Sequence, residues 1–222
     1  MNTYILQQIN EFQSKGSAYS ALLGLRYSNL CVKSDYASLL PVNVYIDGME
    51  ANLEEVANVN QPTEYQLGVF PKTPDNMNDI IDGIYEAHPE FKMEIKSIDG
   101  SQDKDKAFVL YTMPEVDKDR RKMLSDAVEA LYEECKGKLE FIYGEYKAKL
   151  ITEALNAKKE DLDETQKALD EANETLKKQI KGLFERKQQD IEEGYRRYLR
   201  QNEDLDDDGG NDGHSFRISD YQ

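Results

Sequence analysis

Apolar stripes with heptad spacing lie near both ends of the chain, and they most constrain the folds open to it. Apolar residues that alternate steps of four and three form the seam of a coiled-coil-like helix, which needs partner helices to bury it. The first seam comprises Ile5, Ile9, Phe12, Gly16, Tyr19, Leu23, Arg26 and Leu30. The second comprises Leu124, Val128, Leu131, Cys135, Leu139 and Ile142. The third comprises Leu155, Leu162, Leu169, Leu176, Ile180, Leu183 and Ile191.

The two later seams are expected to form a helical hairpin. One helix through residues 116–200 would exceed about 120 Å at ~1.5 Å per residue, with nothing to cover its seam. The expected break is "NAKKEDLDET", where Asp161 followed by Glu164 resembles a capping box.

The segment between the seams has a different period. "VNVYI", "YQLGVF", "FKMEIKSI" and "AFVLYT" are typical of short strands, and "TPDNMNDIIDGIYEAHP" indicates a helix between the second and third of them. The predicted fold is therefore α+β, a three-helix bundle with a small α/β domain inserted between helices one and two.

The predicted domains follow from these changes of pattern. They are helix one in residues 1–32, the inserted domain in 33–113, helices two and three in 114–200 and an acidic disordered tail in 201–222. Two chain crossings would join the bundle to the domain, with hinges at Leu40 and Pro41 and at Met113 and Pro114. Such a double connection permits swinging as a unit.

The charge distribution limits the partners. A net charge of -16 argues against a general nucleic-acid coat, a DNA partner or an anionic membrane surface. Residues 1–115 carry 8 basic and 17 acidic side chains, residues 116–200 carry 19 and 20, and residues 201–222 carry 1 and 7. The least acidic part therefore contains helices two and three.

The sequence shows no signal for targeting or membrane insertion and no cysteine-pair motif. "MNTYILQQINEF" has neither a basic leader nor a continuous apolar core, and no run approaches the roughly 20 apolar residues of a membrane span. We therefore expect a cytoplasmic protein without a membrane partner. Cys31 and Cys135 are isolated, which predicts buried free thiols rather than a disulfide or a zinc site.

"MPEVDKDRRKML", residues 113–124, indicates the start of helix two. Pro114 ends the preceding apolar run, and Asp117 can cap the helix. Asp117 and Asp119 also suit the positive end of the helix dipole.

Collinear segments across nearly the whole chain resemble the ribosome recycling factor family. "LLGLRYSNL" resembles the end of the family's first helix, with its L-x-G-[IL]-R motif, and "VNVYIDG" resembles its first strand. "LEEVANVNQP" is similar to the family's L-x-x-V-A-x-I-x-x-P, and "MPEVDKDRRKML" to its P-x-L-T-E-E-R-R-K-x-L. Third-helix positions are matched by Leu169, Ala172, Leu176, Ile180, Leu183, Phe184, Lys187 and Ile191.

The resemblance implies an L-shaped protein of roughly transfer-RNA dimensions. Such proteins bind between ribosomal subunits after termination and split the ribosome with elongation factor G. Family members hold large-subunit RNA mainly through arginines on the bundle. Arg26, Arg120 and Arg121 match family arginines by position. The candidate RNA-binding residues are Arg26, Arg120, Arg121, Lys138, Lys147 and Lys149.

The chain departs from the family in helix two. The family motif is I-R-x-I-R-R-D-A, and "FIYGEYKA" places Ile142, Glu145 and Tyr146 where its arginines would be. Asn29 replaces a further arginine at the end of helix one. Fewer phosphate contacts mean weaker, less salt-dependent RNA binding. Two functions thus stay open: ribosome recycling, or a divergent paralogue that lost ribosomal-RNA binding and acts as a protein-interaction or regulatory module.

Each candidate also has a structural interpretation. Arg120 and Arg121 either contact RNA or lie on solvated helix surface with one of them pairing to the interdomain junction. Arg26 either contacts RNA or forms a structural ion pair. Tyr143 and Tyr146 either stack on a base or, as we favour, pack in the bundle.

Acidic residues allow two further interpretations. The acidic face of the α/β domain either keeps it soluble or docks a basic protein. This face includes Asp75, Asp79, Asp82 and Glu86. In the tail, Asp204, Asp206, Asp208 and Gly209 fit the first positions of a calcium loop, but Ser215 replaces its bidentate carboxylate. We favour a disordered tail that competes with RNA for basic groups.

Catalytic patterns are not visible. His88 and His214 lie in no metal or triad spacing, and no Gly-rich phosphate loop occurs. We predict a non-enzyme without catalytic residues, cofactor or metal. The oligomeric state stays open, because heptads can pair between chains as well as within one.

Overall fold

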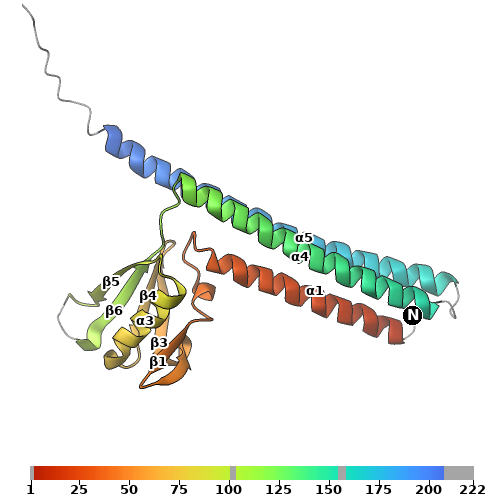
Figure 1. The fold of residues 1–222 in the computed structure, drawn as a ribbon, viewed down its shortest axis with the longest axis horizontal. Helices are drawn as coiled ribbons and strands as arrows, with labels where there is room; N and C mark the ends of the chain where they lie inside the picture. Colours follow the sequence, from red (N-terminus) through yellow and green to blue (C-terminus); the bar gives the residue numbers. More distant parts are fainter. Residues whose placement is uncertain (1–2, 101–103, 155–158, 208–222) are drawn as a thin grey trace, which may run out of the picture.

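The computed structural model describes residues 3–100, 104–154 and 159–207, which form three long helices and a small α/β domain (Figure 1). The long helices are α1 (Thr3–Asn29), α4 (Lys118–Ala154) and α5 (Lys159–Asp207). The strands are β1 (Asn43–Ile46), β2 (Met49–Asn52), β3 (Ala57–Thr63), β4 (Gln66–Pro71), β5 (Lys92–Ser97) and β6 (Ala107–Thr112). The shorter helices are α2 (Leu53–Val56) and α3 (Met77–Ala87), with 3-10 turns η1 (Tyr36–Ser38), η2 (Pro74–Asn76) and η3 (Lys104–Lys106).

The three long helices pack along one another and bury the predicted seams in one core (Figure 1). Phe12 of α1 is fully buried, and its ring meets those of Tyr143 and Tyr146 edge-on, at centroid distances of 6.4 and 5.8 Å. Seam residues buried around it include Ile9, Leu23, Leu124, Val128, Cys135, Leu139, Ile142, Leu169, Leu176, Ile180 and Ile191. The predicted three-helix bundle with an inserted domain is therefore confirmed.

The ends of α5 differ from the expectation. The helix begins at Lys159, two residues before the predicted start at Asp161, and the connection in residues 155–158 lies outside the described residues. It continues to Asp207, so residues 201–207 are helical and the prediction of disorder is wrong for them. The calcium-loop positions Asp204 and Asp206 thus lie in a helix, whereas the rest of the predicted tail, residues 208–222, lies outside the described residues.

The α/β domain is built from antiparallel strands. One sheet has the order β3-β4-β6-β5, and β1 and β2 form a separate hairpin. Asp47 and Gly48 at the hairpin tip have φ of 52° and 79°, the left-handed pair that a tight two-residue turn requires. The core of the α/β domain includes Val44, Leu53, Leu67, Val69, Ile80, Ile84 and Val109. The four predicted strands and the predicted helix are present, and β2 and β3 were not anticipated.

The chain passes between the two cores twice. Cys31 is buried in the α/β core, whereas the adjacent Val32 is buried in the bundle core. On the return, Met113 belongs to the α/β core and Val116 to the bundle core. The return crossing thus includes the predicted position at Met113 and Pro114.

The outward crossing is not where it was predicted. Leu40 and Pro41 lie between Leu39 and Val42, which are both buried in the α/β core. The predicted hinge at Leu40 and Pro41 therefore lies inside the α/β domain, whereas the outward crossing begins at the Cys31–Val32 pair, which contacts both cores, and is complete at Leu39.

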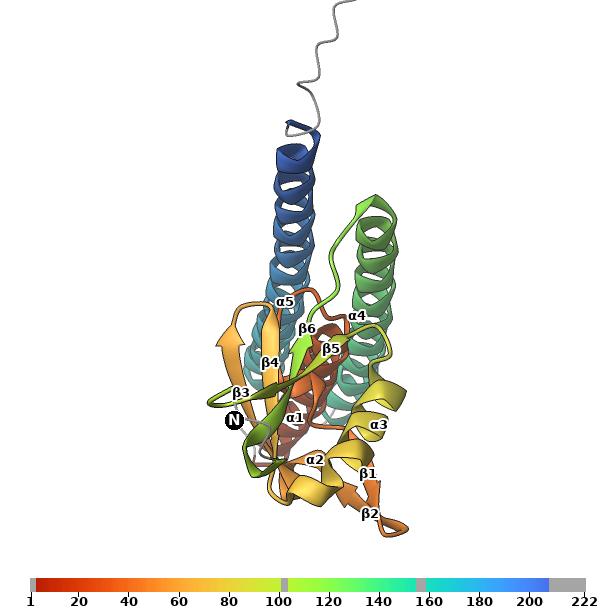
Figure 2. The ribbon, with the colours of Figure 1, turned by 90° about the vertical axis from the view of Figure 1, so that its left-hand side faces the viewer.

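The α/β domain lies beside the end of the bundle where α1 finishes and α4 begins (Figures 1 and 2). α5 runs past this junction and extends beyond the domain (Figure 1). None of the helices in the described part of the chain combines the length and apolarity needed to span a bilayer. The two cysteines are buried free thiols, as predicted.

Candidate nucleic-acid interface

The first turn of α4 is capped as predicted and positions two of the candidate arginines. The Asp117 carboxylate accepts a hydrogen bond from the Arg120 backbone N–H at 2.8 Å, and the Asp117 carbonyl accepts one from Arg121 at 2.9 Å. The first bond satisfies a donor that a helix start leaves unpaired, and the second is the first backbone hydrogen bond of the helix. "MPEVDKDRRKML" is thus a helix start in this structure, whatever else it contacts.

Arg120 points into the junction between the two domains. Its Nη2 donates to the Cys31 carbonyl oxygen at 3.1 Å. An arginine in the first turn of α4, just after the return crossing, thus holds the backbone of the outward crossing. Its Nε is buried without a hydrogen-bond partner among the described residues. The side chain therefore has a structural role, as one of the two interpretations expects.

The side chain of Arg121, from the first turn of α4, packs against the neighbouring helix α5. Its Nη2 pairs with Glu192 at 2.7 Å, and its guanidinium lies 4.8 Å from the centroid of the Tyr195 ring. The side chain is 41% exposed, so part of it is accessible from solvent. A phosphate would have to compete with the Glu192 carboxylate for it.

Arg26 and Lys138 share one carboxylate. Arg26 Nη1 pairs with Glu134 at 2.8 Å, and Lys138 pairs with the other oxygen of the same group. Hydrogen bonds from Lys138, and then from Arg26, lower the pKa of Glu134. Two cations beside one ionised carboxylate leave a net charge of +1 at this place.

The remaining two candidates border the bundle core. Lys149 pairs with Glu145 at 2.8 Å and lies over the Tyr146 ring, while Lys147 lies over the Tyr143 ring at 5.4 Å. Tyr146 is 1% exposed and the Tyr143 hydroxyl donates to Asp170 at 2.5 Å. Packing in the bundle, rather than a free stacking platform, is therefore what these two tyrosines do here.

The residues at the family's arginine positions in helix two are also engaged in contacts within the protein. Ile142 and Tyr146 are buried in the bundle core, and Glu145 is held by Lys149. Ile142 and Tyr146 thus pack against the other helices, and Glu145 forms an ion pair within α4, so cations for a phosphate backbone have to come from elsewhere on the bundle. All six candidates have a protein partner, and as RNA contacts they stay predictions.

A second charged cluster, which the sequence did not reveal, holds the domains together at Lys33. Its ammonium group pairs with Glu64 at 2.9 Å, Asp190 at 3.1 Å and Glu193 at 2.7 Å. Glu64 belongs to the turn between β3 and β4, and the other two acids belong to α5. Lys33, which lies within the outward crossing, therefore ties the α/β domain to the bundle.

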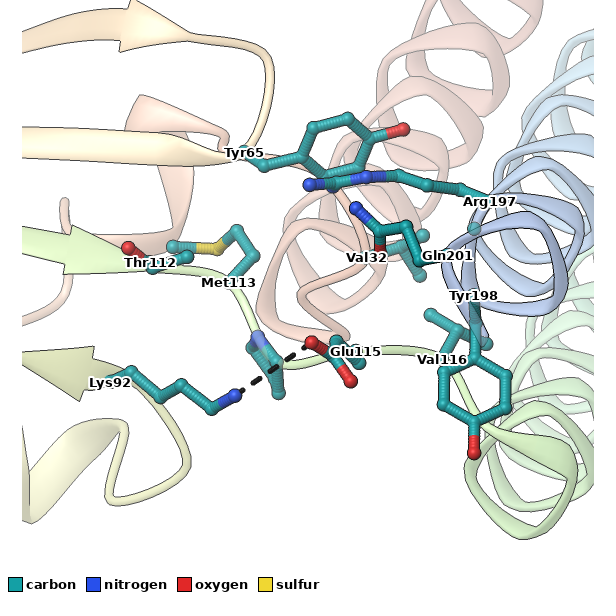
Figure 3. A pocket seen from close by; sticks show the side chains of 12 residues that line it. Val32, Tyr65, Lys92, Thr112, Met113, Glu115, Val116, Arg197, Tyr198 and Gln201 are labelled. Carbon is teal, nitrogen blue, oxygen red and sulfur yellow. Dashed lines mark ion pairs between the residues drawn. The ribbon is translucent and has the colours of Figure 1, made fainter. Parts of the chain in front are cut away.

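Arg197 of α5 strengthens this junction. Its guanidinium lies 3.6 Å from the centroid of the Tyr65 ring, next to which Figure 3 shows it. Beneath them is a cavity of about 50 Å³, whose lining includes Met113 and Val116 of the return crossing. Lys92 and Glu115 form an ion pair at its edge, 3.9 Å apart (Figure 3). Residues of both domains line the cavity, and its volume suits a few waters rather than a larger ligand.

Acid is expected to loosen this junction. Hydrogen bonds from Lys33 and then Gln189 lower the pKa of Glu193 below its ordinary value. A lowered folded-state pKa contributes stability that is present above the unfolded value of about 4.3 and is lost as the pH falls through the folded value. Energy transfer between dyes on Met49→Cys and Ile151→Cys should therefore report a wider distance distribution below about pH 4.

Lys33→Met is the matched variant for this measurement. It removes the ammonium group but keeps the length of the side chain, so the distribution should already be wide at pH 7 and change little with acid. A narrow distribution in this variant at pH 7 would contradict the role of Lys33.

These observations first define a class of fold. Three long helices in an up-down-up arrangement carry an α/β domain that is inserted through two adjacent crossings. A family model for ribosome recycling factor matches residues 30–191. The chain belongs to the ribosome recycling factor family.

Solved structures share this architecture. The solution structure of the ribosome recycling factor is similar over 87% of this chain and 100% of its own, with 13% identity and a TM-score of 0.68. A chain in models for the T. thermophilus ribosome recycling factor and the E. coli elongation factor G bound to the E. coli post-termination complex is similar over 82% of this chain and 98% of its own. Its identity is 19% and its TM-score 0.53. Curated protein sequences gave no match.

Proposed function

We propose that this protein is a translation factor that binds the post-termination ribosome and promotes subunit splitting together with elongation factor G. The observation that carries the proposal is the family match over residues 30–191. Under this proposal the protein is not an enzyme. It acts by binding and by movement of the α/β domain about the two crossings.

The bundle would contact large-subunit RNA at two places. One is the start of α4, where the half-exposed Arg121 is held by Glu192 and Tyr195. The other is the shared site of Arg26, Lys138 and Glu134, which carries a net positive charge. Both places hold their cations in fixed positions, which reduces the entropy lost on binding a phosphate.

A second function is favoured by one specific observation. Ile142 and Tyr146 occupy arginine positions of the family motif and are buried in the bundle core. A paralogue that lost ribosomal-RNA binding would keep the scaffold and use another surface. The exposed carboxylates of Asp75, Asp82 and Glu86 could then dock a basic protein partner.

Subunit splitting and large-subunit binding distinguish the two functions. Arg121→Ala is expected to weaken binding, and the slope of log affinity against log salt should fall by about 0.7–0.9 for one lost phosphate contact. Glu134→Gln should have the opposite effect, because it removes the carboxylate that competes for Arg26 and Lys138. Splitting by elongation factor G and GTP should follow the same order.

Arg186→Ala is the matched control. It removes the same charge from α5, at an exposed arginine whose Nε donates to the Gly182 carbonyl of its own helix. Equal losses in the Arg121 and Arg186 variants would show that only net charge matters. No binding of the unmodified protein to ribosomes at low salt would overturn the proposal and leave the second function.

A further inference from the structure

Three side chains with metal-binding atoms meet where the chain enters the α/β domain. They are Cys31 of the first crossing, His88 at the end of α3, and Glu90 between α3 and β5. One ligand atom from each lies within 4.8 Å of the other two. The Cys31 sulfur is 4.0 Å from His88 Nδ1, which is 3.3 Å from Glu90 Oε1.

The His88 ring is fixed with Nδ1 facing the other two groups. Its Nε2 lies 3.0 Å from the Ser38 carbonyl oxygen, which can only accept a hydrogen bond, so Nε2 carries a proton. The ring stacks on Phe91 at a centroid distance of 4.6 Å and an interplanar angle of 3°. Histidines that bind metals commonly donate their other N–H to a backbone carbonyl in this way. In neutral His88, the Nδ1 lone pair then points toward a thiol and a carboxylate.

The spacing of the three atoms suits a tetrahedral ion. Metal–ligand distances of about 2.0–2.3 Å place neighbouring ligands about 3.4–3.6 Å apart. The Nδ1–Oε1 distance already matches, and the sulfur has to move by less than about 1 Å relative to Nδ1. The sulfur and the Glu90 carboxylate, which lie within 4.8 Å of each other, have to approach by about 1 Å. Cys31 and His88 are buried, while Glu90 is 30% exposed, so its carboxylate can adjust and a water can reach a fourth position.

The charges favour a divalent ion. A thiolate, a carboxylate and a neutral imidazole together carry two negative charges, which one divalent cation balances. Lys187 and Arg120 also act on the Cys31 sulfur, and their positive charges favour its thiolate form, which is the form that binds a metal. Sulfur and imidazole ligands select borderline-soft metals over magnesium or calcium.

We propose that Cys31, His88 and Glu90 form a binding site for a divalent cation of the zinc class. The ion takes the place of the thiol proton, which leaves to solvent, and no other bond changes. Because Cys31 lies in the first crossing, the ion joins that crossing to the segment between α3 and β5. No ligand spacing is visible in the sequence, since 57 residues separate Cys31 from His88.

Cobalt(II) provides the test on the full-length protein. Burial, reinforced by Glu90, raises the pKa of Cys31 to about 11, so the thiol is protonated at pH 7 without metal. A thiolate-to-cobalt absorption band that saturates at one ion per chain is therefore expected only if the metal displaces that proton. Zinc should then displace cobalt and abolish the band, and it should raise the melting temperature.

Matched variants locate the site. Cys31→Ser should lose the band, while Cys135→Ser, at the other buried thiol, should keep it. Glu90→Gln changes a partly exposed group, so it preserves the fold, and it should weaken cobalt binding by at least about 10–100-fold, the loss typical of even an outer-sphere partner. A band that persists in Cys31→Ser, unchanged affinity in Glu90→Gln, or no band in the unmodified protein would each overturn the proposal. None of these results depends on ribosome binding.

Discussion

Replacing Phe12 with alanine is expected to lower the free energy of unfolding by about 3–5 kcal/mol. The Phe12 side chain is fully buried in the bundle core, against the rings of Tyr143 and Tyr146. Its loss removes buried apolar surface and leaves a cavity that the surrounding helices fill only in part. Urea unfolding followed by circular dichroism measures the change, because the shift in midpoint at constant slope gives the difference in stability.

Phe141→Ala is the control for this measurement. Phe141 lies on α4 and is 74% exposed, so the same chemical change should alter stability by no more than about 0.5 kcal/mol. Similar losses in the two variants would contradict the burial of the first seam described here.

Replacing Gly194 with alanine is expected to destabilise the protein by about 1–3 kcal/mol, although alanine is the better helix former. A Cβ atom at Gly194 would lie 2.8 Å from Val116 Cγ2 and 3.1 Å from Val32 Cγ1. Both valines have stiff, β-branched side chains, and they belong to the two crossings. The added methyl group should therefore push the crossings away from α5 and widen the interdomain distance distribution measured with the dyes described above.

Gly182→Ala, on the same helix, is the control and is expected to change stability in the opposite direction. Nothing lies within 4 Å of a Cβ atom at this position, so the better helix propensity should stabilise the protein by about 0.5–1 kcal/mol. A stabilising effect of Gly194→Ala as well would contradict the close contact of Val32 and Val116 with α5.

The bundle was predictable because a heptad period survives in the sequence however the helices are arranged. Phe12, Leu139 and Ile180 were assigned to the seams by spacing alone, and all three are buried. The strands with alternating or β-branched residues, such as "AFVLYT", were found for the same reason.

Elements without such a period were not found. β3 is an edge strand whose last four residues are exposed, and it contains Pro62, which is tolerated at an edge. β2, "MEAN", has no β-branched residue and pairs only with β1. These strands are fixed by their partners rather than by their own composition.

The contacts at the interdomain junction could not be predicted from local sequence patterns. Lys33 meets Glu64 of the α/β domain and Asp190 and Glu193 of α5, and these acids are far from Lys33 in the chain and follow no motif. Likewise, Cys31 and Val32 are adjacent apolar residues that are buried in different cores, so the hydropathy pattern does not mark where the chain leaves the bundle. Candidate sites could be named from a family resemblance, but which cations are paired depends on tertiary contacts.

The adjacency of the two crossings also bears on how a nascent chain folds. α1 is synthesised first, yet its partners α4 and α5 follow only after the whole inserted domain. The entropy lost in closing an unfolded loop grows with the logarithm of its length. Val32 and Val116 both lie against Gly194, so the folded insert has neighbouring ends and converts a long loop into a short one. Early folding of the α/β domain would thus bring α1 back to the α4–α5 hairpin at a small entropic cost.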